Sequence, residues 1–212
     1  METRTPSAGK SLAVTAVGGH SASIMEIEDF LEHNVEGYLF YDLTALAPSG
    51  VGYPWLMTSF GGIELFGALL SQRSFDHSRS EAYFVSYWSK HLYRERDRTV
   101  AQSRALYKLV RHGIAHSFIP KGPIHVAGQN GWRHLTVDPA GNLFVDPERL
   151  ADDLKTSYFR DVRPVLRKST GRVSRTTMNR RLQQMRAAAN SEAADLHLAL
   201  IFPARPEPPV GA

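Results

Sequence analysis

The chain has 212 residues, of which 42% are hydrophobic and 22% charged, an ordinary composition for one globular domain with terminal tails. Cysteine is absent, which excludes disulfides and thiolate metal sites. No apolar run approaches the roughly 18 residues of a membrane helix, so we expect a cytoplasmic protein without a membrane partner.

The formal net charge of +4 is unevenly distributed. Nine Lys or Arg and a single acid, Asp161, lie between Arg160 and Arg186, so this segment carries +8 and the rest of the chain −4. Such a concentration favours a polyanionic partner, with RNA first, although a solvated basic helix face explains the same charges. The predicted nucleic-acid-binding residues are Arg160, Arg163, Arg167, Lys168, Arg172, Arg175, Arg180 and Arg181.

Residues 1–23 are rich in Ser, Gly, Ala and Thr without a sustained period, which predicts a flexible N-terminal tail. One helical domain is expected over residues 24–204. In its first half the apolar residues recur at helical spacing, although Gly61, Gly62 and Gly67 interrupt the second helix and would let another helix approach closely. The predicted helices of this half are residues 23–41, 55–72, 79–93 and 99–113.

After these helices the period changes to that of strands. The sequence "DPAGN", residues 138–142, predicts a hairpin turn between two segments rich in β-branched and aromatic residues. The strand-like segments are residues 123–128, 132–138 and 141–146.

The last part of the domain is helical again. Asp146 and Pro147 favour the start of a helix that runs to residue 168, with a kink or break at Pro164. A basic helix around 178–189 follows, and residues 205–212 form a Pro-rich C-terminal tail. The predicted fold class is therefore mainly α, a helical bundle of about five or six helices with a small β-hairpin insertion after the fourth helix.

The hexapeptide "RHGIAH", Arg111 to His116, closes the fourth predicted helix. Cleavage of RNA by its own 2′-hydroxyl needs an imidazole that moves a proton near pH 7 and a guanidinium that stabilises charge on the phosphate. On an ideal helix the two side chains would lie about 140° apart. They converge only if the helix ends between them, and Gly113 suits such an end.

With this R-x4-H motif at the end of a late helix, followed by a Lys-Gly turn and strands, residues 24–167 resemble the HEPN-like proteins of the standalone bacterial type. The resemblance implies a homodimer whose Arg and His lie in a cleft between protomers and cleave RNA without metal. It makes Arg111 and His116 catalytic. His112 stands where the family usually has Asn or Asp, and we expect it to assist proton transfer. Phe118 replaces a tyrosine that some members carry for modification.

Two other interpretations of the motif stay open. The triplet "RHG" resembles the start of the histidine phosphatases, but those need a strand before Arg111 and a long α/β segment after it, where this chain has helical spacing and 99 residues after Gly113. An Arg and a His at a helix end can also simply bond the free carbonyls of the last turn. The protein would then be a non-catalytic dimeric binding or scaffold module.

Several residues around the motif are candidates for supporting roles. Glu64 lies in the most apolar predicted helix and needs a partner if it is buried; we expect Arg111 to be that partner. Tyr107 and Lys121 flank the motif and would lie near phosphate, unless they are core and turn residues. His112 and His116 have metal-ligand spacing without a third ligand, so neither a metal nor a cofactor is predicted.

Overall fold

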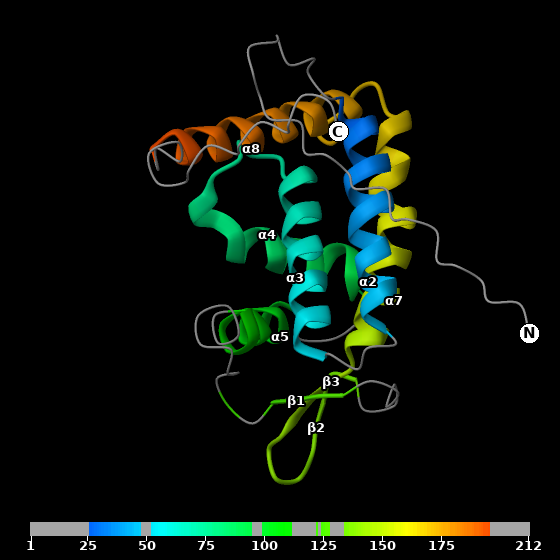
Figure 1. Ribbon diagram of the computed structural model, residues 1–212, viewed down its shortest axis with the longest axis vertical. Helices are drawn as coiled ribbons and strands as arrows, with labels where there is room; N and C mark the ends of the chain where they lie inside the picture. The colour runs from blue at the N-terminus through cyan, green and yellow to red at the C-terminus, as the bar shows by residue number, and fades with distance from the viewer. Residues whose placement is uncertain are drawn as a thin grey trace, which may run out of the picture.

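The computed structural model describes residues 26–47, 52–94, 99–111, 122, 124–127 and 134–195. These residues form six helical rods and one small sheet (Figure 1), which confirms the predicted mainly α fold class. The rods are α1 (Ile27–Phe30) with η1 (Leu31–Leu39) and α2 (Phe40–Leu46); α3 (Gly52–Leu69); α4 (Ser80–Tyr87) with η4 (Trp88–Leu92), preceded by the turn η3 (His77–Arg79); α5 (Thr99–Leu106) with η5 (Tyr107–Arg111); α7 (Pro147–Ser157) with η7 (Tyr158–Val162) and η8 (Arg163–Arg167); and α8 (Arg175–Asp195).

Helix α3 is the centre of the bundle. It packs against α2, α4, α7 and α8, and its apolar side chains Phe60, Ile63 and Phe66 are fully buried. In Figure 1 it stands upright, with the sheet near its lower end and α8 across its upper end. Trp55 and Trp88 are buried packing residues, while Trp132 lies outside the described residues. In the described part of the chain, no helix combines the length and apolar character needed to cross a membrane.

The close approach expected at the α3 glycines occurs at two of them. A Cβ added to Gly67 would lie 2.1 Å from the backbone oxygen of Tyr83, so α3 and α4 touch through their main chains. A Cβ on Gly62 would lie 2.9 Å from a methyl group of Leu154 on α7, whereas one on Gly61 would meet nothing within 4 Å. Two of the three glycines are therefore packing positions.

The sheet contains the predicted hairpin and one strand more. Strands β2 (Thr136–Val137) and β3 (Leu143–Val145) pair antiparallel. In the turn, the Asp138 carboxylate accepts hydrogen bonds from the backbone and side-chain nitrogens of Asn142 at 2.8 and 2.9 Å. Strand β1 (Ile124–Val126) lies parallel to β3 on its other side, in the order β1-β3-β2, a pairing that the hairpin prediction did not include.

A buried polar chain joins the sheet end to the bundle. The backbone N–H of Asp146 donates to His134 Nδ1 at 3.1 Å, so His134 carries its proton on Nε2 and donates it to the Tyr93 hydroxyl oxygen at 2.8 Å. Tyr93 in turn donates to Asp153 on α7 at 2.9 Å. Each polar group in this series of hydrogen bonds has a partner, so the series fixes the position of the sheet against η4 and α7.

The C-terminal helices begin and break where the sequence predicted. Asp146 caps α7 by accepting from the Arg149 backbone at 3.1 Å, and Pro147 occupies the first turn. At Pro164 the rod changes into the 3₁₀ turn η8, which confirms the expected break. Helix α8 is longer than the predicted range 178–189.

Candidate functional site

The predicted catalytic motif is described only at its first residue. The π-helical segment η5 runs to Arg111, while His112, His116 and Lys121 lie outside the described residues. Arg111 is therefore the residue of the motif whose contacts the structure describes.

Arg111 forms the ion pair that was expected with Glu64. Its Nε donates to Glu64 Oε1 at 2.9 Å, and this contact joins η5 to the middle of α3. The Arg111 side chain is 34% exposed and that of Glu64 17%. A half-exposed pair of this kind adds at most about 1 kcal/mol to stability, so its main effect is to orient the guanidinium. Among the described residues this is the one hydrogen bond of the guanidinium, and both terminal nitrogens remain available as donors.

Tyr107 supports this pair from the core side. Its ring is 6% exposed and packs on Phe84 with the ring centres 5.3 Å apart, and its hydroxyl is hydrogen-bonded to Ser80. Burial, followed by the nearby charge of Glu64, raises the pKa of Tyr107. A neutral, buried phenol does not reach a solvent-borne phosphate. Tyr107 is therefore a core residue, the second of the two roles that the sequence left open.

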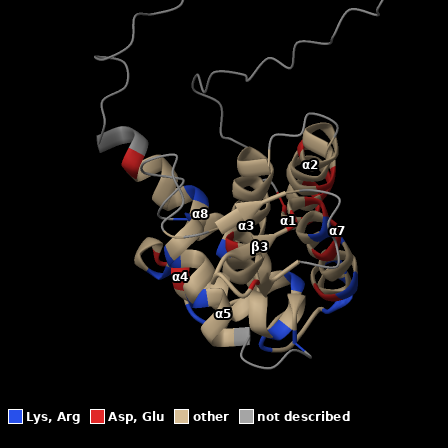
Figure 2. Ribbon diagram, turned by 90° about the horizontal axis from the view of Figure 1, so that it is seen from below, with Lys and Arg blue, Asp and Glu red and all other residues tan. Residues whose placement is uncertain are grey.

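Glutamates of the N-terminal part of the chain form ion pairs with two arginines of the basic segment. Figure 2 shows acidic residues along α1 and α2, beside α7. Arg163 on η8 pairs with Glu36 at 3.2 Å, and Arg175 at the start of α8 pairs with Glu26. These long-range pairs link the C-terminal helices to the N-terminal one, so both guanidinium groups already have a carboxylate partner within the chain.

Arg181 differs from the exposed arginines of the segment. Its side chain is buried, with 5% of the residue exposed. Its Nη1 donates to Gln184 at 3.0 Å, and its Nε donates to the carbonyl oxygen of Ser71 at 3.4 Å, which fastens α8 to the end of α3. Arg181 therefore does not lie on an exposed basic surface.

Arg160 pairs with the neighbouring Asp161 at 2.9 Å. The other five cations of the segment are exposed, and none of them forms an ion pair with a carboxylate in the portion of the chain that the structure describes. They are Arg167, Lys168, Arg172, Arg180 and Arg186.

A groove that the sequence analysis did not anticipate lies between the α3–α4 pair and the η7–η8 segment. Its volume is about 620 Å³. The cationic side chains that line it come from four separate stretches of chain, so no local motif announces it. They are Arg73, Arg79, Lys90, Arg160 and Lys168.

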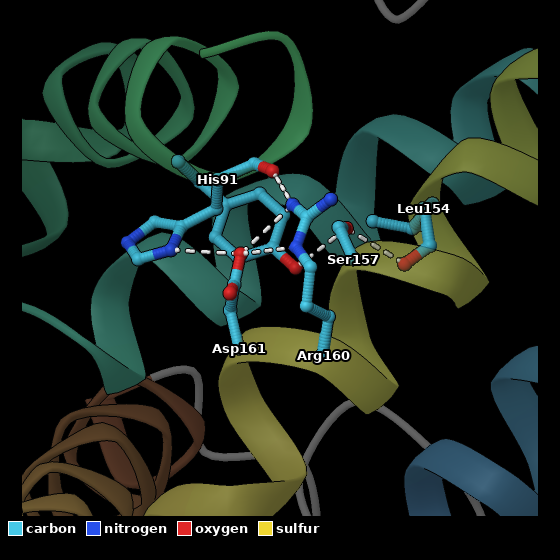
Figure 3. Close-up of polar contacts among 6 residues, drawn as sticks. His91, Leu154, Ser157, Arg160 and Asp161 are labelled. Atoms are coloured by element: carbon cyan, nitrogen blue, oxygen red, sulfur yellow. Dashed lines mark hydrogen bonds and ion pairs between the residues drawn. The ribbon is translucent and has the colours of Figure 1, made fainter.

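One wall of the groove carries a hydrogen-bonded cluster, drawn in Figure 3. The Asp161 carboxylate lies between His91 and Arg160: it accepts from His91 Nδ1 at 3.3 Å and from Arg160 Nη2 at 2.9 Å. Arg160 also donates to the backbone oxygen of His91. Beside them, Ser157 donates to the Leu154 carbonyl oxygen (Figure 3). Because the Ser157 proton is used in that bond, the buried Tyr87 hydroxyl donates to Ser157 at 2.8 Å.

This cluster sets the charge of its members. Burial opposes ionisation of Asp161, but the hydrogen bond and charge of Arg160, with His91, lower the pKa of that carboxyl overall. Burial outweighs the attraction of Asp161 and lowers the pKa of His91, so the imidazole is neutral near pH 7. The contact between His91 and Asp161 is then a neutral-to-charged hydrogen bond. It directs the Nδ1–H of His91 to the carboxylate and leaves Nε2 as an acceptor.

Within the described residues, no three His, Asp or Glu side chains are arranged to hold a metal ion. Comparison of the chain with protein-family models, with curated proteins and with solved structures found no match.

Proposed function

We propose that the protein is a HEPN-like, RNA-binding homodimer that cleaves RNA without metal through its R-x4-H motif. The observation that carries the proposal is the Arg111–Glu64 ion pair. A carboxylate fixes one edge of the guanidinium, while no group among the described residues bonds its terminal nitrogens, so in the proposed site these nitrogens donate to a phosphate. A preoriented cation of this kind stabilises charge that develops on phosphate oxygens during 2′-hydroxyl attack.

His116 would transfer the proton, five residues after the cation, and His112 would assist it. Because one chain offers a single R-x4-H motif, pairing of two protomers would place two arginines and two histidines around one RNA strand. The exposed cations Arg167, Arg172, Arg180 and Arg186 would hold the RNA backbone.

The experiment is RNA cleavage by purified protein in EDTA, with Arg111→Ala and His116→Ala beside the parent. Arg104→Ala is the matched control, because Arg104 is an exposed arginine on the same rod, two turns earlier. We expect cleavage by the parent and the control, and a loss of at least 100-fold in both motif variants, the size typical of removing one catalytic group. If no RNA is cleaved by a folded parent, or if the motif variants cleave as fast as the control, the proposal is wrong.

RNA binding has its own readout. If the exposed cations contact phosphates, the affinity for single-stranded RNA falls with salt, and each lost contact reduces the slope of log K against log salt by about 0.7. Arg172→Ala should show this reduction. Arg181→Ala should leave the slope unchanged, because that side chain is buried. Binding that is insensitive to salt would exclude this surface as the RNA site.

A further inference from the structure

The groove between α3–α4 and η7–η8 is lined mainly by positive charges. Five cationic side chains and one carboxylate line it, which is a net charge of +4 with His91 neutral. The carboxylate, Asp161, already accepts hydrogen bonds from Arg160 and His91, so it offers little to an incoming cation.

The five cations differ in how they are held within the described residues. In the described residues, Arg73, Arg79, Lys90 and Lys168 form no ion pair with a carboxylate. Arg160 is held in place by Asp161 and by the His91 carbonyl, so its orientation along the wall is fixed before any ligand arrives (Figure 3). Mutual repulsion of the other four cations is unfavourable in the empty groove, and an anion between them relieves it.

The shape of the groove limits the size of that anion. A volume of about 620 Å³ lies within the range typical of sites for small molecules. Apolar groups of Leu70, Val165 and Val173 form part of the lining, while the guanidinium and ammonium groups supply hydrogen-bond donors only. A ligand with many acceptor oxygens and several negative charges on a compact framework therefore fits this lining.

We propose that this groove binds a compact polyphosphate, a small molecule or short chain carrying at least three phosphate charges. Arg73, Arg79, Lys90, Arg160 and Lys168 would contact the phosphate oxygens. A single phosphate would leave most of these cations without a partner. An extended RNA strand would place only one charge on each nucleotide and most of its length outside the groove. Arg111, the described residue of the R-x4-H motif, does not line the groove, and the proposed binding does not depend on the activity of that motif.

The test is isothermal titration calorimetry on the full chain with four probes: inorganic phosphate, tripolyphosphate, inositol hexakisphosphate and ATP. We expect one site per chain and an affinity for tripolyphosphate at least tenfold above that for inorganic phosphate. The relative affinities of the last three probes distinguish linear polyphosphate, an inositol phosphate and a nucleotide as the source of the phosphates. Absence of heat with all four at 1 mM would overturn the proposal.

Charge-matched variants separate the groove from the general field of the protein. Arg79→Ala and Lys90→Ala should each weaken tripolyphosphate binding at least tenfold, because each removes a charge-assisted hydrogen bond. Arg180→Ala removes an exposed cation outside the groove and should change the affinity less than twofold. Equal losses in all three would assign the binding to diffuse electrostatics. If a 12-nucleotide RNA displaces tripolyphosphate and Lys90→Ala weakens RNA more than tripolyphosphate, the groove is an RNA surface and the proposal is wrong.

Discussion

Substitution of Gly67 by alanine tests the contact between α3 and α4. The new Cβ would lie 2.1 Å from the Tyr83 oxygen and 2.6 Å from its carbonyl carbon, far inside the 3.0 Å that real Cβ atoms keep. Both obstructing atoms belong to the backbone of α4, so no side-chain rotation relieves them. The two helices must separate, and their movement disturbs the fully buried Phe66 and Phe84.

Overpacking of this severity costs about 3 kcal/mol, the upper part of the usual range, after the gain of about 1 kcal/mol that alanine gives in a helix. For a chain of this length, the melting temperature should fall by roughly 6–12 °C. Gly61→Ala is the matched control, since its Cβ meets nothing within 4 Å, and it should raise the melting temperature by roughly 1–4 °C. Thermal unfolding followed by circular dichroism measures both. Equal melting temperatures for the two variants would refute the assigned packing of α3 on α4.

Three further predictions concern charged and phenolic groups. Glu64→Gln should cost at most about 1 kcal/mol of stability in a melt. If Arg111 is catalytic as proposed, the same substitution should slow RNA cleavage, because the pair orients the guanidinium more than it stabilises the fold. Burial raises the pKa of Tyr87 and of Tyr158, so both should titrate at higher pH in the folded chain than in urea, where tyrosines titrate near pH 10. Because only the unfolded chain ionises them near pH 10, stability that is present below pH 10 is lost as pH rises above it. Absorbance at 295 nm measures the ionisation in both states. His91 should titrate below about 6.5 by NMR, and Asp161→Asn should lower its pKa further; because the folded state disfavours the imidazolium, stability falls as pH drops through 6.5.

The helices and the hairpin could be predicted because their signals are local. Apolar spacing marks α3, the pair Asp146–Pro147 marks the start of α7, and Asp138 with Asn142 closes the turn. The parallel strand β1 could not be predicted, since nothing near Ile124 indicates which later strand it joins.

Of the candidate site, only the Arg111–Glu64 pair could be predicted from the sequence. A carboxylate in an apolar helix needs a partner, and this argument led from Glu64 to Arg111, 47 residues away. The count of positive charges between residues 160 and 186 carried no such information. Helix packing decides that Arg163 forms an ion pair with Glu36 and that Arg181 is buried with its Nε bonded to the Ser71 carbonyl oxygen. No local sequence pattern specifies that packing.

The polyphosphate groove was missed for the same reason. Its cations are separated in the sequence: one lies in the loop after α3, one each on η3, η4 and η7, and one directly after η8. They line one groove only in the folded chain, so no local pattern indicates it.

The most direct test of the proposed RNase activity uses two synthetic oligonucleotides that are identical except for one ribose. The first is an RNA with a mapped cleavage position, and the second lacks the 2′-hydroxyl at that position alone. With EDTA present, cleavage of the first should leave a 2′,3′-cyclic phosphate and require Arg111, and the second should stay intact at that position. Cleavage of the deoxy-substituted strand at the same position, or cleavage only after magnesium is added, would contradict a mechanism in which Arg111 and His116 act on the RNA's own hydroxyl.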